Sequence, residues 1–209
     1  MRVALDEVSQ VLRMDDEGFE ALAAAAHGIP GPDLAPVLAA PGVRQALTAV
    51  TSPLVQVRLD TAGTVSAQSH RMWVDLDAAA LLLAVSAGER QLLWTPPQYL
   101  PAALAKIVDL GPRQVGPRDA RLVEPDVLED LFAANDMRRR SAFTVAEVDV
   151  AWTLAVTWDA GERLMSVVDG DGGLFVVEVV GDSWQLRPVS ATFLWRRFTS
   201  MLPTDEELS

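Results

Sequence analysis

The sequence predicts an α+β protein in which antiparallel sheets carry helices packed on one side. One plan is written twice: two apolar strands joined by a tight turn, then a proline, then an amphipathic helix. The first copy comprises 81–85, the Gly88 turn, 90–94 and a helix ending near 110; the second comprises 174–180, the Gly181 turn, 183–186 and a helix ending near 202. The links between strands are short, which favours antiparallel neighbours. Two copies of a β-hairpin–helix unit suggest a pseudo-twofold repeat.

The sequence pattern predicts helix at the start of the chain. Apolar residues recur at helical spacing over 3–26, which predicts one or two helices with Asp15-Asp16 as a break or cap. A short helix over 43–50 ends at Ser52, because the following proline disfavours helix in the residue before it.

Three segments of the first half then follow a strand pattern. Strict alternation of apolar and polar residues over 54–59 predicts a half-buried strand, and 72–76 and the end of 78–85 continue the sheet. The connection 60–69 is polar and, at about ten residues, longer than a tight hairpin needs. Such a loop is suited to binding.

The turn-rich segment 111–121 divides the chain into two α+β halves, 1–112 and 113–209, of one compact unit. The second half begins with a helix from 124, whose apolar stripe includes Leu128, Leu131 and Phe132. Strand patterns over 151–186 then predict a four-stranded meander, followed by a closing helix over 191–202.

Composition restricts the classes of partner. The formal net charge of −12 disfavours nucleic acid and anionic membrane surfaces. The longest apolar run, 78–85, is far shorter than the roughly 20 residues that span a bilayer, so we expect no membrane insertion. The chain has no cysteine, and no signal-peptide pattern is visible at its start, so we expect a cytoplasmic protein. The basic cluster 138–140 is interpreted as the last turn of a helix, where cations suit the helix dipole.

No motif for catalysis or metal binding stands out. His27 and His70 have no further ligand at metal-binding spacing. The stretch 169–172 superficially matches a calcium loop, but Val180 stands where the loop needs a glutamate, so it reads as a hairpin turn. We therefore expect no catalytic residue, no metal and no cofactor, and a protein that is not an enzyme.

Several short patterns resemble a known family. They are the helix–proline–strand step over 46–59, the Leu110-Gly111-Pro112 joint continuing to Pro117, the Gly181-Asp182-Ser183-Trp184 step, and the proline-led helix over 188–202. Together they resemble the EspG family, the cytosolic chaperones of actinobacterial type VII (ESX) secretion, over roughly residues 40 to 203. The chain is shortened relative to that family in its N-terminal region and its mid-chain helical section.

The resemblance implies binding without chemistry. EspG proteins hold the exposed apolar tip of a helical PE–PPE pair, which keeps the pair soluble and directs it to its secretion system. The family's binding regions correspond here to the 60–70 loop with the following strand and to the helix after 124. The implied partner-binding residues are Thr64, Val65, His70, Trp73, Leu128, Leu131 and Phe132. Ordinary core packing is the alternative role for the last three.

Two other readings of the sequence stay open. A small acidic immunity or antitoxin-type protein would use its negative surface to block a basic toxin, and its binding would weaken steeply with added salt. A groove that holds an apolar tip would be far less sensitive to salt. The sequence also leaves open a homodimer formed through a sheet edge.

Overall fold

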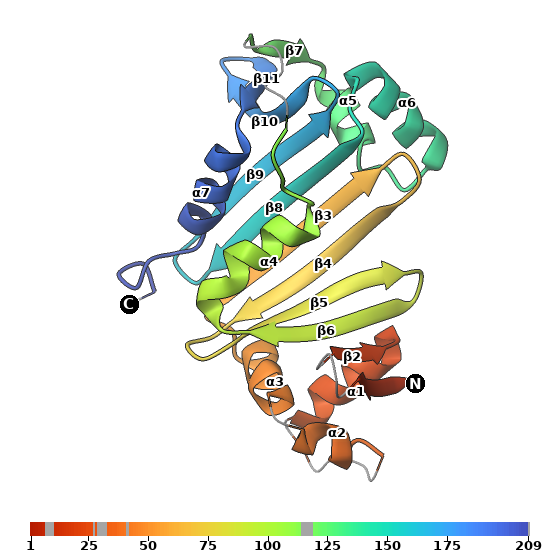
Figure 1. The fold of residues 1–209 in the computed structure, drawn as a ribbon, viewed down its shortest axis with the longest axis vertical. Helices are drawn as coiled ribbons and strands as arrows, with labels where there is room; N and C mark the ends of the chain where they lie inside the picture. The colour runs from red at the N-terminus through yellow and green to blue at the C-terminus, as the bar shows by residue number, and fades with distance from the viewer. Residues whose placement is uncertain (7–10, 27, 29–32, 41, 114–118, 209) are drawn as a thin grey trace.

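The computed structural model describes residues 1–6, 11–26, 28, 33–40, 42–113 and 119–208. These residues form one antiparallel sheet of eleven strands in the order β1-β2-β6-β5-β4-β3-β8-β9-β10-β11-β7 (Figure 1). The strands are β1 (Val3–Asp6), β2 (Val11–Met14), β3 (Val55–Gly63), β4 (Ala67–Val74), β5 (Ala79–Ser86), β6 (Glu89–Thr95), β7 (Arg121–Val123), β8 (Val150–Trp158), β9 (Gly161–Gly170), β10 (Gly173–Val180) and β11 (Ser183–Val189).

Helices flank this sheet on both faces. They are α1 (Asp16–Ala26), α2 (Ala35–Ala39), α3 (Val43–Thr51), α4 (Leu100–Ile107), α5 (Pro125–Asp130), α6 (Asp136–Ala146) and α7 (Ala191–Met201), with a 3₁₀ turn, η1 (Pro97–Tyr99), before α4. Local chemistry sets several of their ends. The side chain of Asn135 caps α6 by accepting from the N–H groups of Met137 and Arg138, and Ser190 caps α7 in the same way. The predicted α+β fold is confirmed.

The two halves of the sheet repeat one topology. In each half a four-stranded meander, β3 to β6 or β8 to β11, leads into a helix, α4 or α7. The β3–β8 pair joins the halves at the centre of the sheet, where Leu59 pairs with Leu154. The strand registers of the two halves also correspond. Val57 of β3 pairs with Met72 of β4 in one half, and Trp152 of β8 pairs with Val167 of β9 in the other. The repeat therefore includes the two central hairpins in addition to the hairpin–helix unit expected from the sequence.

One core lies between the sheet and the α4–α7 layer. Every second residue of the central strands points to this face, and among them Leu59, Leu154 and Val167 are fully buried. Leu104 of α4 and Phe198 of α7 cover them, and the Phe198 ring lies 5.4 Å from the Trp152 ring. The two helices of the repeated unit thus lie side by side on one face, as Figure 1 shows.

The other helices cover the opposite face at its two ends. There α1 and α3 bury a second core with β2, β5 and β6, and α5 and α6 bury a third with β10 and β11. The expectation of helices on one side therefore holds for α4 and α7, while two further helical layers lie on the other side. The reason is that both faces of β5 and β10 are apolar, so both need a cover.

Three local predictions were wrong. Residues 3–6 and 11–14 form two antiparallel edge strands, because β2 extends the sheet beside β6, and among the described residues of 1–26 the helix is confined to 16–26. The predicted long loop 60–69 is almost entirely strand, since β3 and β4 pair as far as Ala62 and Ala67. The basic cluster 138–140 lies near the start of α6, so it does not serve the C-terminal dipole of that helix.

Candidate functional site

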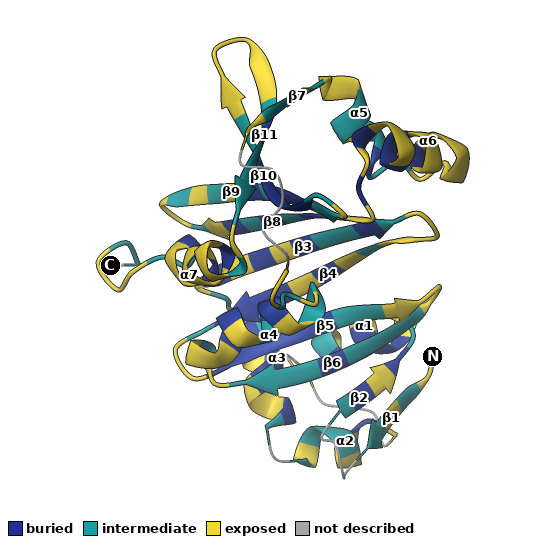
Figure 2. Ribbon diagram, turned by 45° about the horizontal axis from the view of Figure 1, so that its top comes forward, coloured by how far each residue is buried: buried dark blue, intermediate teal, exposed yellow. Residues whose placement is uncertain are grey.

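The centre of the sheet is uncovered on the face opposite α4 and α7. On this face α1 and α3 pack over Ala80, Leu82 and Leu92 at one end, while α5 and α6 pack over Ala62 and Phe175 at the other. Between these layers the central strands keep exposed and half-exposed residues, as the burial colouring of Figure 2 shows, while Trp73 beside α1 is buried.

Cross-strand pairing arranges these side chains in three rows. The rows are Trp73, Gln56, Thr157 and Glu162; Arg71, Arg58, Ala155 and Leu164; and Ser69, Asp60, Thr153 and Ser166. Each row contains one residue from each of β4, β3, β8 and β9. The rows form a continuous floor on which a partner could lie.

Two adjoining hollows make this floor a groove. A hollow of about 350 Å³ lies over Arg71, Trp73 and Glu162, and one of about 440 Å³ lies over Asp60, Ser69 and Thr153. Both include Arg58, so they meet along β3. The second hollow is bounded by Phe132, which follows α5. We call this combined feature the groove.

The groove floor is polar and carries two arginines. The Arg58 guanidinium binds the Asp60 carboxylate at 3.0 Å. The Arg71 guanidinium lies 5.5 Å from the Phe19 ring centre and 5.4 Å from that of Trp73, and these two rings stack on one another. Leu164, which is 67% exposed, supplies an apolar contact in the same row. The floor can therefore bind both charged and apolar groups of a partner.

The turn between β3 and β4 is held at one end of the molecule by α6. The Arg139 side chain donates to the carbonyl oxygens of Gly63 (3.1 Å) and Val65 (3.2 Å), and Arg140 donates to that of Thr64 (3.4 Å). Val65 at the tip is 78% exposed, and Met137 at the start of α6 is 79% exposed. These contacts bring the β3–β4 hairpin and the α5–α6 segment together, the two regions for which the family resemblance implied partner binding.

The seven predicted partner-binding residues occupy different environments. Thr64 and Val65 are exposed on the turn, and Leu128 and Phe132 are half-buried beside α6. Trp73 forms part of the groove floor but is mostly covered by Phe19. His70 and Leu131 are buried.

His70 serves to link β4 to β5 where the two strands diverge. Its Nδ1 accepts a hydrogen bond from the Ala84 N–H at 3.1 Å, and Nε2 lies 3.5 Å from the Thr61 hydroxyl. Burial, helped by the nearby Arg90 guanidinium, lowers the pKa of His70, although the Asp60 carboxylate opposes this shift. The neutral imidazole is therefore the form that the fold favours.

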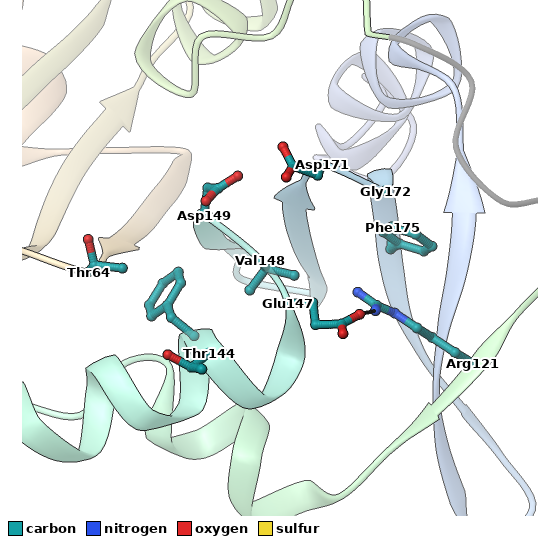
Figure 3. A pocket seen from close by; sticks show the side chains of 10 residues that line it. Thr64, Arg121, Thr144, Glu147, Val148, Asp149, Asp171, Gly172 and Phe175 are labelled. Atoms are coloured by element: carbon teal, nitrogen blue, oxygen red, sulfur yellow. Dashed lines mark hydrogen bonds and ion pairs between the residues drawn. The ribbon is translucent and has the colours of Figure 1, made fainter.

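A separate pocket of about 560 Å³ lies between the β3–β4 turn and the C-terminal end of α6 (Figure 3). Arg121 of β7 pairs with Glu147 at 3.2 Å, and its guanidinium lies 4.8 Å from the Phe175 ring centre. Asp149 and Asp171 also line the pocket, and neither has an ion-pair partner among the described residues. The pocket therefore has a negative lining.

Sequence reasoning missed the arginines of the groove and the role of Arg139. Arg58 occupies a polar position in the alternating strand pattern, which reads as a solvent-facing side chain. Its closeness to Arg71 and Ala155 depends on the registers of β3 with β4 and β8, which no local pattern specifies. The basic run 138–140 was the one sequence feature that pointed to the contact between α6 and the β3–β4 turn.

Metal-ligand groups and membrane-spanning helices are both absent from the part of the chain that the structure describes. Among the described residues, no group of three or more His, Asp or Glu side chains gathers as a metal-ligand set. In the same residues, no helix has both the length and the apolar character needed to cross a bilayer.

The fold is similar to that of a solved chaperone. The structure is that of the Mycobacterium tuberculosis type VII secretion system chaperone EspG5 in complex with the PE25–PPE41 dimer. The similarity covers 92% of this chain and 97% of that chain, with a TM-score of 0.56 and 13% sequence identity. No protein-family model and no curated protein sequence matches the chain. The comparison therefore establishes a shared fold over nearly the whole length of both chains.

Proposed function

We propose that this protein is a cytosolic, non-enzymatic chaperone or adaptor that binds helical secretion substrates similar to PE–PPE pairs. Two lines of support converge on this function. The fold is shared with a chaperone that was solved together with such a dimer. The groove supplies an uncovered surface about as wide as the four central strands, between two helical layers.

The observation that carries the proposal is the mixed character of the groove and its surroundings. Leu164 on the floor and the exposed Val65 and Met137 near the β3–β4 turn offer apolar contacts to a partner. Arg58, Asp60 and Glu162 offer polar ones. An apolar helical tip with polar flanks would find both kinds of contact here, which suits recognition of an amphipathic segment.

Binding of purified PE–PPE pairs from the source genome tests this function. Each pair is titrated into the purified protein by calorimetry, and the complex is sized by light scattering. We expect at least one pair to bind, and Leu164→Asp to weaken its binding about tenfold or more because a carboxylate would be desolvated in the interface. Leu122→Asp is the matched control, since Leu122 is equally exposed but lies on edge strand β7, away from the groove.

The same titrations at low and high salt separate this function from that of an acidic immunity protein. Binding that survives about 1 M salt supports the apolar tip, because exposed charge pairs are largely screened there. The proposal is wrong if no PE–PPE pair binds, or if Leu164→Asp and Leu122→Asp bind equally well.

A further inference from the structure

Two arginines face each other at the centre of the groove. Arg58 of β3 and Arg71 of β4 are cross-strand partners. Directly opposite residues have Cβ atoms about 5 Å apart, and like charges in such a pair destabilise a sheet. The arrangement costs free energy in the protein alone, so its benefit should be sought in what binds there.

The two guanidinium groups are held in different ways. Arg58 is paired with Asp60 in the next row of the floor. Arg71 lies over the stacked rings of Phe19 and Trp73, and among the described residues no carboxylate lies within ion-pair distance of it. Arg71 is therefore the uncompensated cation of the pair.

The aromatic rings orient Arg71 without using its hydrogen-bonding capacity. A guanidinium attracted to the face of a ring retains N–H donors along its edge, which match the two oxygens of a carboxylate. The side chain is exposed on the groove floor, so a partner can reach it. Glu162 also lines this hollow, but it lies on β9, beyond β3 and β8 from Arg71. In a chain with net charge −12, the β4 side of the hollow is therefore a local site for an anionic group.

We propose that Arg71, supported by Arg58, is a specificity-determining residue that binds an acidic side chain at the tip of the helical partner. This inference rests on the proposed function, because it assigns a chemical feature to the partner held in the groove. The occupant is the turn between two helices of the partner, carrying an Asp or Glu that enters the 350 Å³ hollow beside Trp73. Leu164, in the same row, contacts the neighbouring apolar residues of that turn.

A selection experiment tests this inference with a defined probe. A displayed library of two-helix hairpins with randomised turns is selected in parallel against the wild-type protein, Arg71→Glu and Arg196→Glu. Arg196 is an exposed arginine on α7, which covers the other face of the sheet, so Arg196→Glu is the matched control for net charge. We expect Asp or Glu to be enriched in the turns that bind the wild-type protein and the control, and Lys or Arg in those that bind Arg71→Glu.

Individual hairpins make the result quantitative. An acidic hairpin selected on the wild-type protein should bind Arg71→Glu about tenfold or more weakly, and replacing its acid by Arg should recover the loss. The neutral Arg71→Gln should weaken binding and reduce its salt dependence, an effect that a purely structural role would not produce. Selected turns without acidic enrichment, or equal binding by Arg71→Glu and Arg196→Glu, would overturn this inference alone. The titrations with PE–PPE pairs decide the proposed function separately.

Discussion

The Arg139 guanidinium of α6 donates a hydrogen bond to the Gly63 carbonyl oxygen at the end of β3, at 3.1 Å. The same side chain also bonds the carbonyl oxygens of Val65 and Ala133 and the Asp136 carboxylate, and only 2% of the residue is exposed. A buried charge is tolerated when it is paired and hydrogen-bonded. Arg139 therefore fixes the β3–β4 turn to the α5–α6 segment.

Replacing Arg139 by alanine should destabilise the protein by about 3 kcal/mol, because three backbone acceptors lose a charged donor at once. Arg138→Ala is the control, since Arg138 makes an exposed ion pair with Asp130 that is worth at most about 1 kcal/mol. Urea denaturation of both variants measures the free energy of unfolding. Equal losses would show that the Arg139 contacts do not hold the turn.

Gly42 should tolerate alanine far less well than Gly88. Both glycines have positive φ, 82° and 75° respectively, so each alanine meets backbone strain of about 1 kcal/mol. At Gly42 a Cβ atom would also lie 2.0 Å from Nε1 of Trp94, whereas at Gly88 it would meet no atom within 4 Å. We expect Gly42→Ala to cost about 2 kcal/mol or more and Gly88→Ala about 1 kcal/mol, measured by urea denaturation. Similar costs would mean that Trp94 can move aside.

Replacing a phenylalanine by alanine should destabilise the protein by different amounts at the two ends of α7. Phe198 is fully buried against Trp152, so Phe198→Ala removes a ring from the centre of the core and should cost about 3–5 kcal/mol. Phe193 is 37% exposed beneath Arg187, so Phe193→Ala should cost about 1 kcal/mol or less. Thermal and urea unfolding measure the two losses of stability. A larger loss for Phe193→Ala than for Phe198→Ala would contradict this expectation.

The duplicated plan was visible in the sequence because each copy is local. The strand, turn and helix patterns of β5, β6 and α4 lie within one continuous stretch, as do those of β10, β11 and α7. The order of the whole sheet was not visible. The β3–β8 pairing that joins the halves connects residues such as Leu59 and Leu154. Contacts between residues so far apart in the sequence leave no periodic pattern in it.

The edge strand and the groove were missed for related reasons. The strands β1 and β2 are four residues each, too short for alternation to be distinguished from helical spacing. Polar residues such as Asp60 and Ser69 suggested a loop over 60–69, but both lie on the uncovered face of the sheet, where polar residues are expected. The groove exists because α1–α3 and α5–α6 stop short of the sheet centre, which only tertiary packing determines.

The stability of the protein should fall at mildly acidic pH through His70. Burial lowers the pKa of its imidazole below the ordinary value of 6.5, so the unfolded chain binds a proton more readily than the folded one. This contribution to stability is fully present above about pH 6.5 and is lost as the pH falls towards the folded-state pKa, by at most about 1.4 kcal/mol per pH unit. Protonation of Nδ1 would also end its acceptance from the Ala84 N–H.

His70→Asn isolates this effect, because its amide oxygen can still accept from the Ala84 N–H but does not titrate. Urea denaturation of both proteins at pH 7.5, 6.5 and 5.5 gives the difference in unfolding free energy at each pH. All other ionisable groups are present in both proteins, so their contribution largely cancels in that difference. The wild-type protein should lose its advantage over His70→Asn as the pH falls, because only its imidazole resists protonation in the fold. A difference that stays constant from pH 7.5 to 5.5 would mean that His70 binds its proton equally well in the folded and unfolded chains.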